Sequence, residues 1–197
     1  MTRPLVLAST SRYRRELLER LGLPFVAAAP RYEEEQDLPL PPDGLVIELA
    51  TRKARSLAAL HPEARIVGCD QVVSVDGRIL GKPGTEDAAV RQLLAMAGRT
   101  HRLLTGLVVL EPATGRLETA LDVHEVAVRP LDEARARAYV RRDRPLDCAG
   151  SLRVESLGIA LLERLRGDDY TAVIGLPLIA LTTLLARFGV RPIEPSM

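Results

Sequence analysis

The sequence has no Trp, and aromatic residues make up only 3% of its 197 residues. Its hydrophobic share of 47% is therefore almost entirely aliphatic, which predicts a core of Leu, Val, Ala and Ile. A chain of this length can bury a substantial core, and we expect residues 1–197 to form a single domain.

Cysteine is also scarce. Cys69 and Cys148 stand far apart and form no CxxC motif, which argues against a disulfide framework and a cysteine zinc site. The first apolar run, residues 5–8, is far too short for a signal-peptide core or a membrane span. We therefore expect a cytoplasmic protein with reduced thiols and no membrane partner.

Neither positive nor negative charge is in large excess, because the sequence has 27 Lys and Arg residues and 26 Asp and Glu residues. The resulting net charge of +1 predicts no general attraction to a nucleic acid polymer. Several catalytic motifs are absent as well: GxxxxGK[ST], GxSxG and HExxH do not occur. Their absence argues against a P-loop enzyme, a serine hydrolase with a nucleophile elbow, and a zinc protease.

The pattern of apolar and turn residues predicts a mixed α/β fold, with a mixed sheet flanked by helices. A strand at residues 5–8 leads through a serine-rich loop into a helix that Gly22 ends, and residues 31–44 are expected to be an irregular loop. Asp76-Gly77 predicts a tight hairpin. The further helices are expected at 45–60, 85–98, 132–141 and after Pro177, and the further strands at 65–69, 71–75, 78–80, 100–110, 117–128 and 157–165.

Three arginines, Arg12, Arg14 and Arg15, crowd the first turn of the first predicted helix. Cations there oppose the helix dipole and cost about 0.3 to 1 kcal/mol each. A bound anion would reverse the sign, since backbone N–H groups, the Ser9 hydroxyl and guanidinium groups all donate to phosphate oxygens. The alternative is a solvated basic helix face, and this feature alone does not decide between them.

Asp70 follows a buried strand directly, where a carboxylate is costly unless it is paired or binds a metal. It is our candidate for a metal ligand and for the base that activates water, against the alternative of a turn aspartate. Lys53 and Lys82 are candidate phosphate ligands, although each could be an ordinary surface lysine. The run Glu33-Glu34-Glu35 offers a further metal-binding carboxylate or a solvated acidic segment.

Taken in order, these segments resemble the Maf, or septum-formation-inhibitor-like, nucleotide pyrophosphatases over almost the whole chain. The motifs that carry the resemblance are Ala8-Ser9-Thr10-Ser11 with Arg14-Arg15-Glu16-Leu17-Leu18, Lys53-Ala54, Gly68-Cys69-Asp70-Gln71, Gly81-Lys82-Pro83, Cys148-Ala149-Gly150-Ser151 and Gly175-Leu176-Pro177-Leu178. The resemblance implies two lobes around a deep cleft, a divalent cation such as Mg²⁺ or Mn²⁺, and a homodimer. It also implies hydrolysis of a nucleoside triphosphate to the monophosphate and pyrophosphate.

Matched position by position, the resemblance implies that Asp70 activates water and that Glu34 and Asp70 hold the metal. The phosphate ligands that it implies are Ser9, Arg14, Arg15, Lys53 and Lys82.

Within the family, Tyr13, Gln71 and Glu155 make the sequence resemble the 7-methyl-GTP branch. A 7-methylguanine base is cationic, so the Tyr13 ring can stack on it, and Glu155 can accept hydrogen bonds from its N1–H and 2-amino groups. The alternatives are a UTP, dTTP or other non-standard nucleotide pyrophosphatase, and a non-catalytic nucleotide sensor that regulates cell division.

Overall fold

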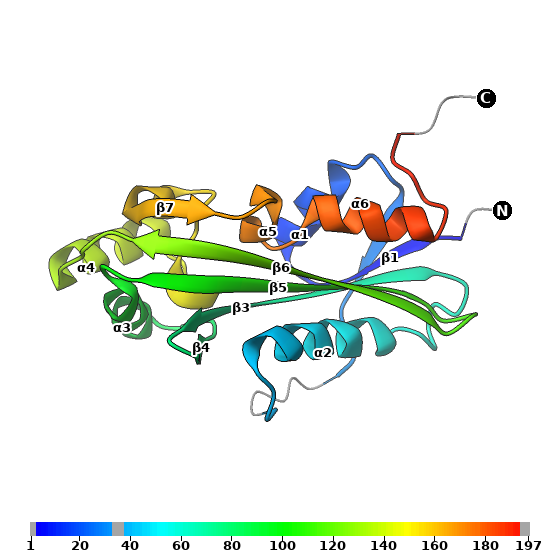
Figure 1. Ribbon diagram of the computed structural model, residues 1–197, viewed down its shortest axis with the longest axis horizontal. Helices are drawn as coiled ribbons and strands as arrows, with labels where there is room; N and C mark the ends of the chain where they lie inside the picture. The colour runs from blue at the N-terminus through cyan, green and yellow to red at the C-terminus, as the bar shows by residue number, and fades with distance from the viewer. Residues whose placement is uncertain (1–2, 33–37, 194–197) are drawn as a thin grey trace. The chain divides into compact units, whose positions relative to one another are not determined.

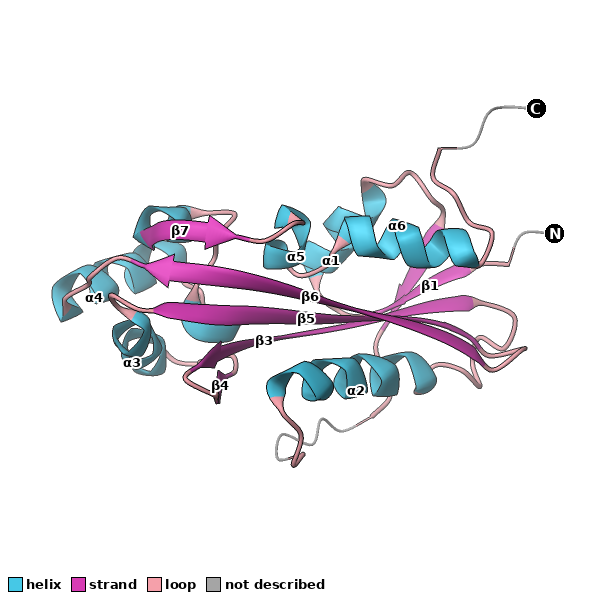
Figure 2. Cartoon of the chain, viewed as in Figure 1, coloured by secondary structure: helices cyan, strands magenta, loops and turns pink. Residues whose placement is uncertain are grey.

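The computed structural model describes residues 3–32 and 38–193, and the chain divides into two compact units. The first unit comprises Met1–Asp70, Thr105–Asp122 and Asp169–Met197, and the second comprises Gln71–Leu104 and Val123–Asp168. Strands of one seven-stranded sheet contribute to both units (Figures 1 and 2).

The sheet has the strand order β2-β1-β3-β5-β6-β7, and β4 pairs with β3. It is mixed, because β1 is parallel to β2 and β3, whereas the β3–β4 and β6–β7 pairs are antiparallel. The strands are β1 (Leu5–Ala8), β2 (Phe25–Ala28), β3 (Arg65–Val75), β4 (Arg78–Leu80), β5 (Thr100–Glu111), β6 (Arg116–Val128) and β7 (Leu162–Arg166). The predicted α/β class with a mixed sheet is confirmed.

Helices cover both faces of the sheet in the first unit: α1 (Arg12–Glu19), α2 (Pro42–Arg55), α5 (Tyr170–Ile174) and α6 (Leu178–Arg187). Alternate residues of β1 and β3 enter two different cores, as the period of a strand requires. Leu7 and Val67 pack with the leucines of α1 and α6, whereas Val6 and Ile66 pack with the alanines of α2. Accordingly, α2 lies on one face of these strands and α1 and α6 lie on the other (Figure 1).

Two glycines let α2 approach the sheet unusually closely. A Cβ atom built on Gly68 of β3 would lie 2.1 Å from the backbone oxygen of Ala50, and one on Gly106 of β5 would lie 2.4 Å from that of Val46. No side chain fits at these distances, so both positions require glycine for space. The helix backbone therefore rests directly on two neighbouring strands.

The second unit contains the helices α3 (Glu86–Met96) and α4 (Glu133–Asp143) and the short 3₁₀ helices η1 (Ala149–Ser151) and η2 (Leu157–Leu161). The predicted hairpin is present, with φ of 48° at Asp76 and 81° at Gly77. The Thr85 hydroxyl caps α3 by accepting from the Ala88 amide at 3.3 Å. Within the part of the chain that the structure describes, no helix is both long and apolar enough to cross a membrane.

Three predicted elements were wrong in extent. The loop expected at 31–44 ends early, because α2 begins at Pro42, whose fixed φ suits the first turn of a helix. The same helix stops at Arg55 instead of residue 60. The strand expected at 157–165 starts as η2 and becomes β7 only at Leu162. Strand β2 and helix α5 were not predicted, because four or five residues carry too little periodicity.

The buried His101 of β5 makes the second unit sensitive to acid. Only 3% of the residue is exposed and its Nδ1 lacks a hydrogen-bond partner among the described residues, and burial lowers its pKa to about 4. The unfolded chain, with an ordinary pKa near 6.5, takes up the proton first, so this contribution to stability is complete above pH 6.5 and is lost as pH falls towards 4.

Between pH 7 and pH 4.5 the free energy of unfolding should fall in both proteins. We expect the fall to be smaller in His101→Gln than in the native protein, by roughly 2 kcal/mol. Urea unfolding at both pH values measures the difference. His61→Gln, which removes a partly exposed histidine, is the control and should keep the native pH dependence. Parallel losses in His101→Gln and the native protein would refute the assignment.

Candidate functional site

The carboxyl end of β1 is a topological switch point of the sheet. From β1 the chain runs through α1 to β2 on one side, and from β2 it returns through α2 to β3 on the other side of β1. Ligands of open α/β sheets bind outside the carboxyl ends of strands at such a point. Strand β1 ends at Ala8, whereas β3 continues to Val75, so the segment after Ala8 lies next to the middle of β3.

Asp70 lies in this middle part of β3, 9% exposed, and forms a buried ion pair with Lys53 of α2. The Lys53 ammonium donates a short hydrogen bond to Oδ1 of the carboxylate. The close approach of α2 over Gly68 explains the pairing. Asp70 follows Gly68 by two residues on the same strand face, and Lys53 follows Ala50 by one helical turn.

Arg14 reaches the same region from the opposite face of β3. Its Nε donates to the Gly175 carbonyl at 2.9 Å, and the Cys69 thiol lies 3.2 Å from that oxygen. The pKa of Cys69 is raised mainly because the thiol is fully buried, while the charges of Arg14, Asp70 and Lys53 also act on it. Of the predicted residues, Lys53 and Asp70 are in direct contact on one face of β3, and Arg14 lies on the other face.

The loop between β1 and α1 is held by its own serines. The Ser9 hydroxyl, in a residue only 7% exposed, accepts from the Ser11 amide at 3.1 Å, and Ser11 caps α1 by accepting from the Arg14 amide. Arg15 is exposed on α1. The Tyr13 ring is covered by the Arg12 guanidinium, whose carbon lies 4.7 Å from the ring centre. Tyr13 therefore packs against a cationic side chain, and its role in base binding stays a prediction.

The remaining predicted residues, Gln71, Lys82 and Glu155, belong to the second unit, and Glu34 lies outside the described residues. Lys82 is exposed in a loop that is tied to the segment containing Gly150. The Gly81 carbonyl accepts from the Gly150 amide at 3.2 Å and from Nε2 of Gln92 at 3.1 Å. Two motifs that are far apart in the sequence are thereby joined.

Glu155 lies near Arg153, whose side chain anchors this segment to the end of α4. The Arg153 guanidinium donates to the Asp143 carbonyl at 2.8 Å and approaches Oε1 of Glu155 at 4.0 Å. Partial burial raises the pKa of Glu155, an effect that Arg153 opposes. Burial also raises the pKa of Cys148 to about 11, so this thiol is protonated at neutral pH and is a poor nucleophile.

The described residues contain no group of three His, Cys, Asp or Glu side chains that would hold a metal by themselves. The donors present nevertheless fit Mg²⁺, which is commonly bound by one or two carboxylates together with substrate phosphates. Asp70 supplies such a carboxylate at the switch point.

Gly68 and Gly175 stand in the motifs that carry the resemblance, but the sequence gave neither of them, nor Arg153, a role in supporting the site. Gly68 could have been found, because an isolated glycine inside a strand indicates a close backbone approach. The roles of Gly175 and Arg153 had no such signal in the sequence. Gly175 acts through its contact with Arg14, which is 161 residues away, and Arg153 acts through its contact with the end of α4.

The fold and these charges define a class: a mixed α/β protein whose candidate site combines cationic side chains with a buried carboxylate at a switch point. Comparison with known proteins identifies the family. The family model described as Maf-like protein matches residues 4–188, and the chain belongs to this family.

Three relatives that match almost the whole chain carry the same name. A protein named 7-methyl-GTP pyrophosphatase from Syntrophotalea carbinolica is 52% identical over 95% of both chains. Proteins of the same name from Pseudomonas aeruginosa and Nitrosococcus oceani are 45% and 47% identical, covering 95% and 94% of this chain and 97% and 93% of their own.

Proposed function

We propose that the protein hydrolyses 7-methyl-GTP to 7-methyl-GMP and pyrophosphate and so removes a modified nucleotide from the cellular pool. The observation that carries the reaction class is the buried Lys53–Asp70 pair at the switch point, with Arg14 bound to the Gly175 carbonyl on the other face of β3. The shared name of relatives that match almost the whole chain supports the substrate.

In the proposed reaction Asp70 accepts a proton from water. The water oxygen then bonds to the α phosphorus, the bond from that phosphorus to the bridging oxygen breaks, and pyrophosphate leaves with the electron pair. Lys53, bound to Oδ1, orients the carboxylate so that Oδ2 can take the proton. A divalent cation held by Asp70 and the phosphate oxygens would neutralise charge on the phosphates.

The proposed phosphate ligands are cations and donors around the carboxyl end of β1. Arg14 and Arg15 sit on the first turn of α1, where an anion is also stabilised by the helix dipole. The Ser9 hydroxyl and Lys53 complete the set in the first unit, and Lys82 is the ligand proposed from the second. Neutralising charge that builds on the leaving group is the largest contribution that such sites usually make.

Base selection is assigned to Tyr13, Gln71 and Glu155. The Arg12 guanidinium over the Tyr13 ring shows the kind of partner that this ring accepts, and a cationic 7-methylguanine would take its place. Glu155 would accept hydrogen bonds from the N1–H and 2-amino groups, which uracil and thymine do not offer in this arrangement.

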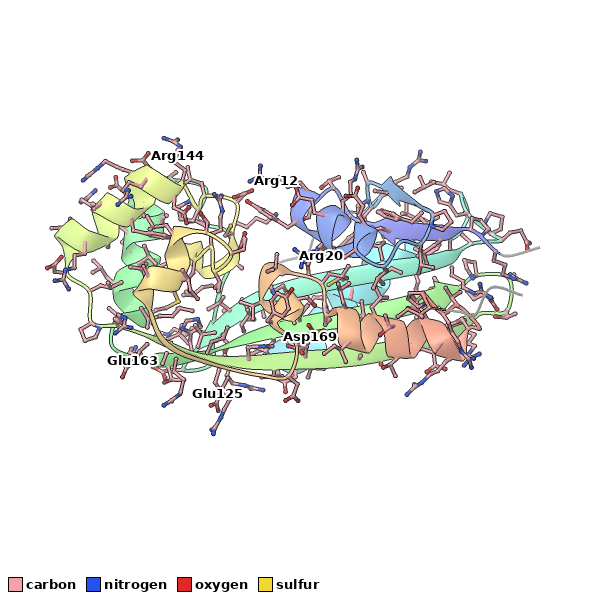
Figure 3. The ribbon with its side chains drawn as sticks, turned by 90° about the horizontal axis from the view of Figure 1, so that it is seen from above. Arg12, Arg20, Glu125, Arg144, Glu163 and Asp169 are labelled. Atoms are coloured by element: carbon pink, nitrogen blue, oxygen red, sulfur yellow. The ribbon has the colours of Figure 1, made fainter. Side chains whose placement is uncertain are left out.

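Glu155→Gln should lower the ratio of kcat/KM for 7-methyl-GTP to that for UTP by about tenfold or more, because a charged acceptor is replaced by an amide that also donates. Steady-state rates with both nucleotides give the ratio. Glu163→Gln, an exposed glutamate of the same unit, is the control (Figure 3). An unchanged ratio in Glu155→Gln would remove this residue from base selection.

The proposed function itself is tested by a panel of nucleoside triphosphates with Mg²⁺ or Mn²⁺ and detection of pyrophosphate. We expect 7-methyl-GTP to give the highest kcat/KM. A preference for UTP, dTTP or another non-standard nucleotide would keep the reaction and reject the substrate. Nucleotide binding without product would reject the reaction and favour a sensor.

A further inference from the structure

A single buried carboxylate closes the amino ends of two helices in the first unit. Asp169, 5% exposed, precedes α5, and its Oδ1 accepts from the Thr171 amide at 2.9 Å and from the Thr171 hydroxyl. Its Oδ2 accepts from the Ile179 amide in the first turn of α6 at 2.7 Å. Figure 3 labels Asp169 at the start of α5. The orphan amides of α5 and α6 thus share one acceptor.

Thr171 ties the turn between the two helices from within. Its Oγ1 accepts from the Leu178 amide at 2.9 Å, and its carbonyl oxygen accepts from the amides of Gly175 and Leu176 at 3.2 and 3.3 Å. Gly175 has a φ of 134°, which side-chain-bearing residues rarely adopt. These bonds and this backbone conformation together fix the direction of the Gly175 carbonyl.

That carbonyl holds Arg14. Nε of Arg14 donates to it at 2.9 Å, and the Cys69 thiol contacts the same oxygen from β3. A guanidinium group is planar, so fixing Nε restricts where the two terminal nitrogens can point. They have no hydrogen-bond partner among the residues that the structure describes and remain available to an anion.

We propose that Asp169 is a positioning residue for Arg14. It holds the turn between α5 and α6, the turn aims the Gly175 carbonyl, and the carbonyl orients the Arg14 guanidinium for the phosphates. The inference rests on the proposed function, in which Arg14 binds phosphate. When the cap is lost, the carbonyl shifts, and a misplacement of about 1 Å can lower the rate by about a hundredfold.

A double-mutant cycle separates positioning from simple support of the fold. Asp169→Asn replaces one carboxylate oxygen with an NH₂ group, which cannot accept from the amide that the oxygen bound. Thr171→Val removes the hydroxyl that bonds to Asp169 and to the Leu178 amide. Each variant is made alone and together with Arg14→Lys, which keeps the charge but lacks the Nε–H that the Gly175 carbonyl accepts. Alone, Asp169→Asn and Thr171→Val should each lower kcat/KM for 7-methyl-GTP by about 10- to 100-fold. Added to Arg14→Lys, each should lower kcat/KM by no more than about twofold relative to Arg14→Lys alone.

Two controls accompany the cycle. Thr171→Ser keeps the hydroxyl and should retain native kcat/KM. Asp132→Ala removes the cap of α4, where Oδ1 accepts from the Arg135 amide at 2.8 Å, and should leave kcat/KM unchanged while lowering stability. Thermal unfolding shows which variants are folded at the assay temperature, and Thr171→Val decides the question if Asp169→Asn does not fold.

Losses of equal size in the native and Arg14→Lys backgrounds, or unchanged kcat/KM in Asp169→Asn and Thr171→Val, would overturn the positioning role and leave the proposed function intact. Unchanged kcat/KM in Arg14→Lys and Arg14→Ala would overturn the phosphate role of Arg14 and the positioning role with it.

Discussion

Asp70→Asn should reduce turnover of the preferred nucleoside triphosphate by about a thousandfold, because the amide retains the shape of the carboxylate but cannot accept a proton from water. The loss should appear in kcat, with nucleotide still bound through the arginines and Lys82. Pyrophosphate release at saturating nucleotide, measured well below the unfolding temperature, tests it.

Glu111→Gln is a closely matched control. The side chains of Asp70 and Glu111 are both 12% exposed, and both pair with cations, Glu111 with Arg3 and Arg65. Glu111 ends β5 and has no proposed part in the reaction. Its amide variant should keep kcat within about twofold. Turnover by Asp70→Asn at the level of Glu111→Gln would remove Asp70 from the role of base.

The Lys53–Asp70 pair should also show a large coupling in stability. Removing one partner of a buried ion pair leaves an uncompensated charge and costs about 3 to 5 kcal/mol. We therefore expect Lys53→Met and Asp70→Asn each to be clearly destabilised, and the double variant to be more stable than the sum of the two losses predicts by about 1 to 3 kcal/mol. Urea unfolding of the four proteins measures this coupling.

The ion pair between Arg52 and Glu48 provides the comparison on the same helix. Their side chains are 33% and 39% exposed, and an exposed pair four residues apart is worth only about 0.3 to 0.5 kcal/mol. A cycle of Arg52→Gln and Glu48→Gln should give a coupling of that size. If the Lys53–Asp70 cycle gave no more, the buried pair would not be a preformed part of the site.

The elements that could be predicted were those with strong local signals. The hairpin at Asp76-Gly77 and the cap at Thr85 depend on backbone preferences of single residues, and both are present. Strand β2 and helix α5 were missed because their four and five residues are stabilised by neighbours: β2 pairs with β1, and α5 depends on the Asp169 cap. The equally short β1 was predicted because its four residues are an unbroken apolar run that is fully buried, a local signal that β2 and α5 lack.

The charged residues of the site could likewise be identified from the sequence, but the residues that they contact could not. Arg14, Lys53 and Asp70 were singled out in the sequence, whereas the Lys53–Asp70 ion pair and the Gly175 carbonyl as the partner of Arg14 were not foreseen. The pairings depend on α2 resting on Gly68 and on the turn between α5 and α6, which join segments 17 and 161 residues apart.

By itself, the sequence determined the α/β class, the main strands and helices and the chemical groups of the candidate site, because hydrophobic period, turn chemistry and unusual charge are local properties. Only the tertiary structure decided that β1 is a switch point, that Lys53 meets Asp70 in the protein interior, and that Asp169 caps both α5 and α6. The physical reason is that burial and hydrogen-bond partners are set by packing between segments that are distant in the chain.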